Sequence, residues 1–193
     1  MSGGVVLEDA DRPFFVEIAE ALSAHGLAVA SAFAERPVAL IINRAVALNP
    51  TAFEAVTDDA FDAALEDSLL EVLDLIQKWV PRLADGAAIV VLTSRAHLGA
   101  WGAAPEAAAS AALAGFCRTL ALEFASRGTR VNLAAADFVD AYASDPVGRI
   151  RVAEAVAWLA SDRAGAISGQ VVLLDRGRGL QMREAQPRDL SAP

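Results

Sequence analysis

The chain has 193 residues, of which 55% are hydrophobic, and carries a formal net charge of −9 at pH 7. This length suits one domain with a single sizeable core, and the apolar content excludes a disordered chain. The acidic balance disfavours nucleic acid and anionic membranes as partners, because binding to phosphates needs clustered cations. With Cys117 as the single cysteine, and no signal peptide or membrane span recognisable, we expect a cytoplasmic protein.

Short apolar runs alternate with segments of helical periodicity along the chain. The run Val38–Ile42 has no polar alternation, which is typical of a strand covered on both faces. Strands are predicted at Val5–Leu7, Leu27–Ala30, Val38–Ile42, Ala88–Leu92, Arg130–Ala135 and Val171–Leu174. Helices are predicted at Arg12–His25, Asp58–Leu83, Pro105–Ser126 and Val152–Ser161.

Strands that alternate with helices in one chain predict a parallel sheet wound on both faces. We therefore expect an α/β fold with one reduced, doubly wound Rossmann-type sheet of about six strands and helices on both faces. Residues 1–177 are predicted to form this domain, and residues 178–193, which contain Pro187 and Pro193, a loose tail.

Three segments resemble the short-chain dehydrogenase/reductase family. They are Ala111–Gly128 (AALAGFCRTLALEFASRG), Gly128–Ala135 (GTRVNLAA) and Val152–Gly177 (VAEAVAWLASDRAGAISGQVVLLDRG). The last is the most specific, because Ser168-Gly169-Gln170 precedes an apolar strand that ends in Asp175. The resemblance covers nearly the whole chain, from Val5 to Gly177, and implies the fold of an oxidoreductase that uses a nicotinamide cofactor.

The resemblance also implies a Tyr-x-x-x-Lys pair, in which the tyrosine donates a proton and the lysine lowers its pKa and holds the nicotinamide ribose. These two positions fall on Glu106 and Ser110. A serine has no charge with which to lower a neighbour's pKa, and a carboxylate has no proton to offer near neutral pH unless its pKa is strongly perturbed. The chain holds one tyrosine, Tyr142, and one lysine, Lys78, on different predicted elements, so the pair cannot be written anywhere in it.

Two further catalytic positions follow from the resemblance. The family's catalytic asparagine falls on Ser68, whereas its catalytic serine is kept as Ser94, which alone could only polarise a carbonyl. Ser94, His97 and Glu106 could also be imagined as a hydrolytic triad, but no Gly-x-Ser-x-Gly elbow supports it. Two histidines and one cysteine offer no metal-ligand spacing, so we expect no metal.

The cofactor contacts implied by the resemblance are degraded as well. The glycine-rich turn aligns with Glu8–Phe15, where no glycine remains and carboxylates stand where a phosphate needs donors and positive potential. A plain solvated turn explains those carboxylates equally well. The degenerate positions are Asp9, Pro13, Phe15, Asn43 and Asp137. From these changes we expect no bound NAD(P).

Two connections are shorter than in that family. Ser31–Pro37 is too short to hold the third strand beside the adenine site, and the segment between Phe138 and Arg149 is too short for substrate-covering helices. Both the cofactor site and the substrate cover are thus predicted to be reduced, while the packing elements stay.

The long predicted helices are rich in small and apolar residues. In the family such helices pair with their copies across two-fold axes, although the same faces could simply cover the protein's own sheet. Helices that are apolar on more than one face must bury the second face elsewhere. The residues assigned to such an interface are Leu69, Val72, Ile76, Ala107, Ala111, Ala114, Gly115 and Trp158.

These observations favour a non-catalytic subunit that assembles with itself or with an active family member. The alternative is a divergent NAD(P)-dependent oxidoreductase that acts on a carbonyl or hydroxyl group with Ser94 or Glu106 as an unusual proton donor. A third reading is a small-molecule-binding protein that uses the emptied cleft. Fold analogy alone does not choose among the three.

Overall fold

The computed structural model describes residues 4–8, 12–30, 35–47 and 49–180. Its six strands form one sheet in the order β2-β1-β3-β4-β5-β6, and every neighbouring pair is parallel. The strands are β1 (Gly4–Glu8), β2 (Ala28–Val29), β3 (Ala39–Asn43), β4 (Ala88–Ser94), β5 (Arg130–Ala136) and β6 (Val171–Leu174). The predicted Rossmann-type α/β architecture is confirmed.

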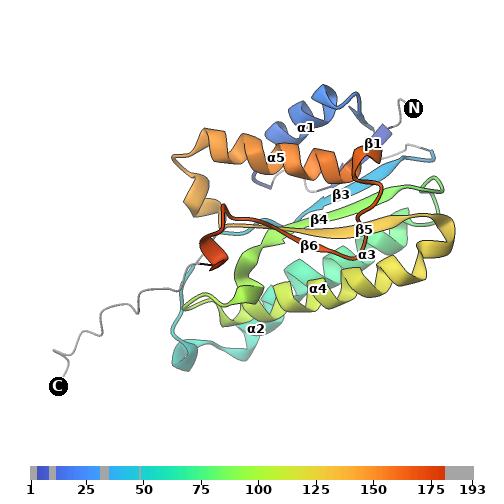
Figure 1. Cartoon of the computed structure of the whole chain (residues 1–193). Helices are drawn as coiled ribbons and strands as arrows, with labels where there is room; N and C mark the ends of the chain where they lie inside the picture. Colours follow the sequence, from blue (N-terminus) through green and yellow to red (C-terminus); the bar gives the residue numbers. More distant parts are fainter. Residues whose placement is uncertain (1–3, 9–11, 31–34, 48, 181–193) are drawn as a thin grey trace, which may run out of the picture.

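Helices cover both faces of the sheet (Figure 1). On one face lie α1 (Phe15–Ala24) and α5 (Pro146–Ala160). On the other lie α3 (Glu71–Trp79) and α4 (Ala104–Glu123), with α2 (Asp58–Leu65) packed against α4. Strand residues alternate between the two layers, so that Ile41 packs beneath α1 and α5 whereas Leu40 and Ile42 pack beneath α3 and α4.

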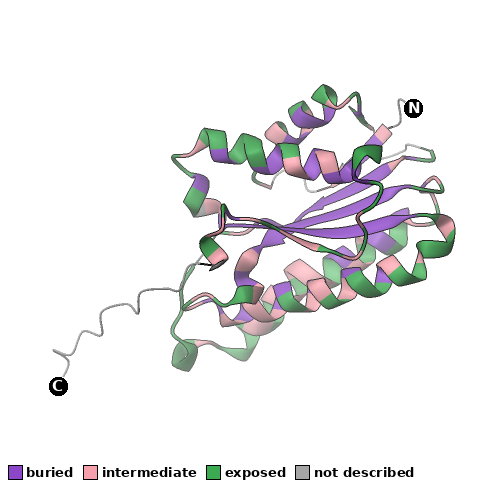
Figure 2. Cartoon of the chain, in the orientation of Figure 1, coloured by how far each residue is buried: buried purple, intermediate pink, exposed green. Residues whose placement is uncertain are grey.

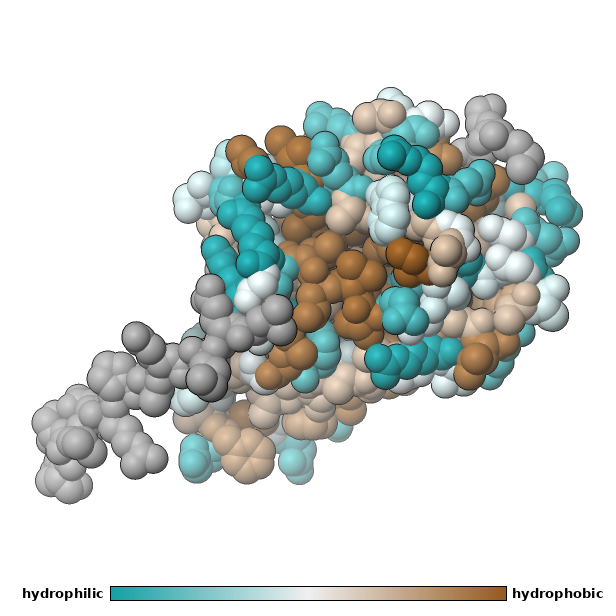
Figure 3. All heavy atoms as spheres, in the orientation of Figure 1, coloured by the Kyte–Doolittle hydropathy of each residue, from teal (hydrophilic) through white to brown (hydrophobic). Residues whose placement is uncertain are grey.

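The central strands are buried along their whole length, as Figure 2 shows for the middle of the sheet. This matches the continuous apolar runs of β3 and β4, which have no polar alternation. By contrast, the edge strand β6 is only partly covered, and Leu173 is exposed. Figure 3 shows apolar side chains gathered over this strand, between α5 and α4.

Several element boundaries differ from the predicted ones. The predicted helix Asp58–Leu83 consists of α2, a π-helical turn at Glu66–Leu70 and α3, which ends at Trp79. The helix predicted to start at Val152 starts at Pro146, because the Asp145 side chain accepts a hydrogen bond from the Gly148 amide and caps it.

At the first helix, the start moves from Arg12 to Phe15. Phe14 has a φ of 72°, in the left-handed region, which is incompatible with continuing a right-handed helix toward the N-terminus. The predicted strand Leu27–Ala30 is limited to Ala28–Val29, at the edge of the sheet. Within the described residues, no helix has the length and hydropathy that crossing a bilayer requires.

Candidate functional site

The carboxyl ends of β1 and β3 lie side by side, although the chain leaves them in opposite directions. From β1 it passes through α1 to β2 on one side, while β3 begins the succession of β4, β5 and β6 on the other. Ligands of open parallel sheets bind in the crevice at such a switch point. The carboxyl edge of the sheet is therefore the candidate site.

Asn43, at the end of β3, spans this crevice. Its fully buried side-chain amide donates to the Pro13 carbonyl in the β1–α1 loop. Its side-chain oxygen accepts from the Ala45 amide at 3.2 Å. One side chain thus joins the loop after β1 to the loop after β3 across the switch-point crevice.

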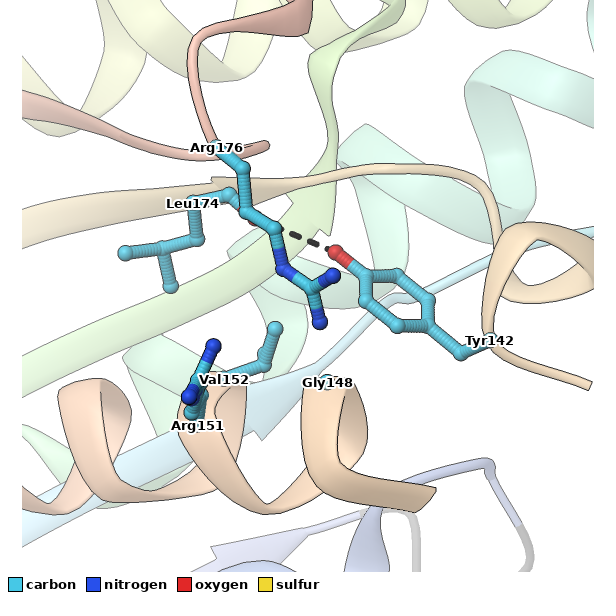
Figure 4. Close-up of a pocket in the computed structure, with 6 residues that line it drawn as sticks. All are labelled: Tyr142, Gly148, Arg151, Val152, Leu174 and Arg176. Carbon is cyan, nitrogen blue, oxygen red and sulfur yellow. Dashed lines mark hydrogen bonds between the residues drawn. The ribbon is translucent and has the colours of Figure 1, made fainter. Parts of the chain in front are cut away.

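Phe14, the residue after Pro13, has a buried aromatic ring. The Phe14 side chain is 2% exposed and meets the Tyr142 ring edge-on, with the ring centroids 5.3 Å apart. The Tyr142 hydroxyl donates to the Leu174 carbonyl at 3.1 Å, as Figure 4 shows, and accepts from the Asp137 amide. Burial raises the pKa of Tyr142, so its phenol stays protonated at neutral pH. The only phenol in the chain is therefore committed to packing and to backbone hydrogen bonds.

Asp137, directly after β5, is the centre of a charged cluster. Its buried carboxylate accepts from Arg95 at 2.5 Å and from Arg178 at 2.7 Å. The buried Asp175 lies 3.8 Å from Arg95 and accepts from the backbone amides of Gly177 and Gly179. This cluster draws the segment after β6 back over the carboxyl ends of β4 and β5.

The positions that the resemblance assigns to catalysis lie near the end of β4. The Ser110 hydroxyl donates to the Ser94 carbonyl at 2.9 Å and lies 3.4 Å from His97 Nδ1. Ser94 Oγ accepts from the Ala96 amide. The Glu106 carboxylate is partly buried, and its Oε2 atom has no hydrogen-bond partner among the described residues. Ser68 lies on the π-helical turn, which packs against α4.

The histidine in this group is neutral at physiological pH. Burial lowers the pKa of His97, and the positive charge of Arg118 lowers it further. A neutral imidazole can share a hydrogen bond with the Ser110 hydroxyl, but in the described structure no hydrogen bond joins it to Ser94 Oγ. The hydrolytic triad of Ser94, His97 and Glu106 is not assembled.

Arg44 is a site residue that the sequence reasoning missed. It is buried directly after β3, where it pairs with Glu71 and lies 3.7 Å from Asp67. Arg12 also pairs with Asp67. The signal was the spacing of Asp67 and Glu71, which puts two carboxylates on one helical face toward the end of β3. These ion pairs connect the π-helical turn and the start of α3 to the residues that follow β1 and β3.

The residues predicted as an interface fall into two groups. Val72 and Ile76 are buried in the chain's own core and offer no surface to a partner, because α3 presents this face to the sheet. Ala111 and Gly115 are exposed on α4. The remaining members are partly buried: Leu69, Ala107, Ala114 and Trp158.

The positions that the resemblance assigns to cofactor binding differ in where the structure places them. Asp9 lies outside the described residues. Pro13 is exposed, and Phe15 is half-buried at the start of α1. It is Phe14, and not Phe15, whose ring is buried: it packs in the core cluster beneath α1 and α5, edge-on to Tyr142.

Known structures share this fold. A short-chain dehydrogenase/reductase from Serratia marcescens superposes with a TM-score of 0.75 at 20% identity, covering 91% of this chain and 96% of the other. A 3-ketoacyl-(acyl-carrier-protein) reductase from Brucella melitensis, complexed with NADH, superposes with a TM-score of 0.75 at 19% identity over 92% and 98% of the two chains. Residues 16–151 match the family model described as Enoyl-(Acyl carrier protein) reductase.

The chain belongs to the short-chain dehydrogenase/reductase family. A curated relative in this family, 3-oxoacyl-(acyl-carrier-protein) reductase of Salmonella typhimurium, is 30% identical over 161 residues. The match covers 72% of this chain and 66% of the relative. The chain therefore spans just under two thirds of the relative's length.

Proposed function

We propose that this short-chain dehydrogenase/reductase is a non-catalytic subunit that assembles with an active member of its family, or with itself. The observation that carries the proposal is the closure of the candidate site by the chain's own side chains. Asn43 reaches the β1–α1 loop, and the Phe14 ring packs against Tyr142, at the crevice where relatives of this fold class bind dinucleotides.

Chemistry at the end of β4 supports the same proposal. Glu106 and Ser110 stand where the family resemblance implies the tyrosine and the lysine. The Ser110 hydroxyl is engaged by the Ser94 carbonyl and has no charge with which to lower the pKa of a proton donor. This arrangement offers no group suited to hold a nicotinamide ribose and deliver a proton together.

Exposed apolar side chains on α4 and the π-helical turn form a candidate interface for the proposed subunit. Leu122 on α4 is 80% exposed, and Leu70 on the π-helical turn is 48% exposed. The exposed Ala111 and Gly115 allow a second helix to approach α4 closely, because interaxial distance depends on the side chains at the contact. A helix pair from another subunit would cover this face.

The test is assembly of the full chain. Its mass is measured by size exclusion with light scattering, alone and mixed with an intact short-chain dehydrogenase/reductase that keeps the Tyr-x-x-x-Lys pair. We expect a stable oligomer, alone or mixed, whose reductase activity resides in the partner. A monomer under both conditions would contradict the proposal.

A divergent NAD(P)-dependent oxidoreductase is the second candidate. It is favoured by the reductase names of the relatives and by the grouping of Ser94, His97 and Ser110 within hydrogen-bonding reach. Replacing Ser94 by alanine distinguishes the two. The non-catalytic subunit predicts unchanged turnover of an assembled complex, whereas a working site in this chain predicts a large loss.

A further inference from the structure

A cavity of about 140 Å³ lies between the first turns of α5 and the carboxyl end of β6. Figure 4 shows its lining, which is Tyr142, Gly148, Arg151, Val152, Leu174 and Arg176. For comparison, a cavity of roughly 150 Å³ in another protein holds benzene. The space is therefore large enough for a molecule with about as many heavy atoms as benzene.

Two guanidinium groups enter this cavity from opposite walls. Arg151 rises from α5, and Arg176 reaches in from the loop after β6 (Figure 4). Arg176 pairs with Asp145 at 2.6 Å. Arg151 makes no ion pair with any residue that the structure describes, so the three groups together leave one positive charge uncompensated.

Two backbone features allow the Arg176 side chain to reach the cavity. Arg176 has a φ of 57°, which a non-glycine residue rarely adopts and which costs energy. Gly148 leaves room for its guanidinium, because a Cβ there would lie 2.6 Å from the terminal nitrogen of Arg176. Strain of this kind persists where the surrounding structure holds it, and it is concentrated at binding sites.

The remaining wall of the cavity is apolar. Val152 is buried on α5, Leu174 is half-buried at the end of β6, and Tyr142 presents the side of its ring while its hydroxyl is turned to the Leu174 carbonyl. A fully hydrated anion would gain nothing from these groups. An anion with a short apolar chain would bury that chain against them.

From this geometry we propose that the cavity binds a small aliphatic monocarboxylate, whose carboxylate lies between Arg151 and Arg176 and whose chain packs against Val152, Leu174 and Tyr142. Guanidinium groups match the planar carboxylate with paired hydrogen bonds. One negative charge balances the excess positive charge of the site. The proposal goes beyond the assembly function and does not depend on it.

The test is a titration of the full chain at constant ionic strength, followed by calorimetry and by the amide NMR shifts of Gly148 and Val152. The probes are butyrate, acetate, the neutral butyramide and inorganic phosphate. We expect butyrate to bind at millimolar concentration and acetate, which has two fewer methylene groups, to bind roughly tenfold more weakly. Butyramide should shift neither amide, and phosphate, which pairs with guanidinium groups but gains nothing from the apolar wall, should bind more weakly than butyrate.

Variants locate the binding. Arg151→Gln should weaken butyrate binding by roughly tenfold, since it removes a charge-assisted hydrogen bond. Because Arg151 makes no ion pair in the described structure, this variant should keep the thermal stability of the wild type. Arg163→Gln is the matched control and should bind butyrate normally. Arg163 is exposed and follows the C-terminal end of α5, whereas the cavity lies at the first turns of that helix.

Four results would overturn the proposal. Absence of butyrate binding at millimolar concentration excludes the site. Equal binding of butyrate and butyramide, or of butyrate and phosphate, excludes the assigned ligand class. Unchanged butyrate affinity in Arg151→Gln shows that the carboxylate binds elsewhere.

Discussion

The ring of Phe14 stands at 80° to the ring of Tyr142, with their centroids 5.3 Å apart. Phe14 precedes α1, and Tyr142 follows β5, so this one contact joins two segments that are far apart in the sequence. It does so at the carboxyl edge of the sheet, where relatives of this fold class hold their ligands. Under the proposed function, this packing takes the place of a bound ligand.

Phe14 should therefore respond unusually to substitution. Phe14→Ala removes a buried aromatic ring and should lower the free energy of unfolding by about 3 kcal/mol. Phe14→Gly removes even more, yet its backbone suits the φ of 72°, so it should be more stable than the alanine variant by about 1 kcal/mol. Urea denaturation measures both. A glycine variant no more stable than the alanine variant would show that the left-handed backbone carries no cost.

Nicotinamide cofactors should not bind to the purified chain. If the proposed function is right, calorimetric titration with NADH and with NADPH should give no micromolar dissociation constant, because Asn43 and Phe14 would occupy the crevice. A micromolar value for either cofactor would mean that the β1–α1 loop opens, and it would favour the oxidoreductase alternative.

Ala111 should matter for assembly and not for folding. Because it is exposed on α4, Ala111→Glu should change the free energy of unfolding of the isolated chain by less than about 0.5 kcal/mol. In an assembled seam the same carboxylate would be buried without a partner, and the complex should dissociate. Ala24→Glu, exposed at the end of α1 on the opposite face of the sheet, is the control and should leave the mass from light scattering unchanged.

In the Asp137 cluster, substitution of the central carboxylate should lower the free energy of unfolding more than substitution of the exposed Arg178. Asp137→Asn leaves the partly buried Arg95 without its nearest carboxylate and should cost about 3 kcal/mol of unfolding free energy. The Arg178 side chain is 46% exposed, so Arg178→Gln should cost less than about 1 kcal/mol. Denaturation midpoints compare the two. Equal losses would indicate that Arg178, and not Arg95, depends on this carboxylate.

Cys117 should make the fold less stable at high pH. Burial raises the pKa of its thiol to about 12, from an ordinary value of 9.0. Between these values the unfolded chain loses the proton while the folded chain keeps it, so the free energy of unfolding falls as pH rises, by up to about 1.4 kcal/mol per pH unit. In Cys117→Ala this contribution disappears and the decline should be shallower. Identical declines in the two proteins would mean that the folded thiol ionises normally.

The sequence by itself determined the sheet and its layers. The runs Val38–Ile42 and Ala88–Leu92 are apolar without alternation, which is typical of a strand covered by helices on both faces. It also determined that no tyrosine stands four residues before a lysine, since residue identity and spacing need no coordinates. The cap of α5 at Asp145 was visible in the sequence as Asp-Pro, although the helix was predicted to start later.

Only the tertiary structure decided what fills the candidate site. Nothing in the local sequence says that Phe14 turns inward while Phe15 begins a helix, because that choice depends on a left-handed backbone and on a tyrosine 128 positions away. The same holds for Arg44, Arg95 and Arg178, whose carboxylate partners come from other elements. Val72 and Ala111 look alike as apolar helix positions, and only the packing of α3 and α4 onto the sheet buries the first and exposes the second. Periodicity is a local property of the chain, whereas ion pairs and ring contacts form between segments that folding brings together.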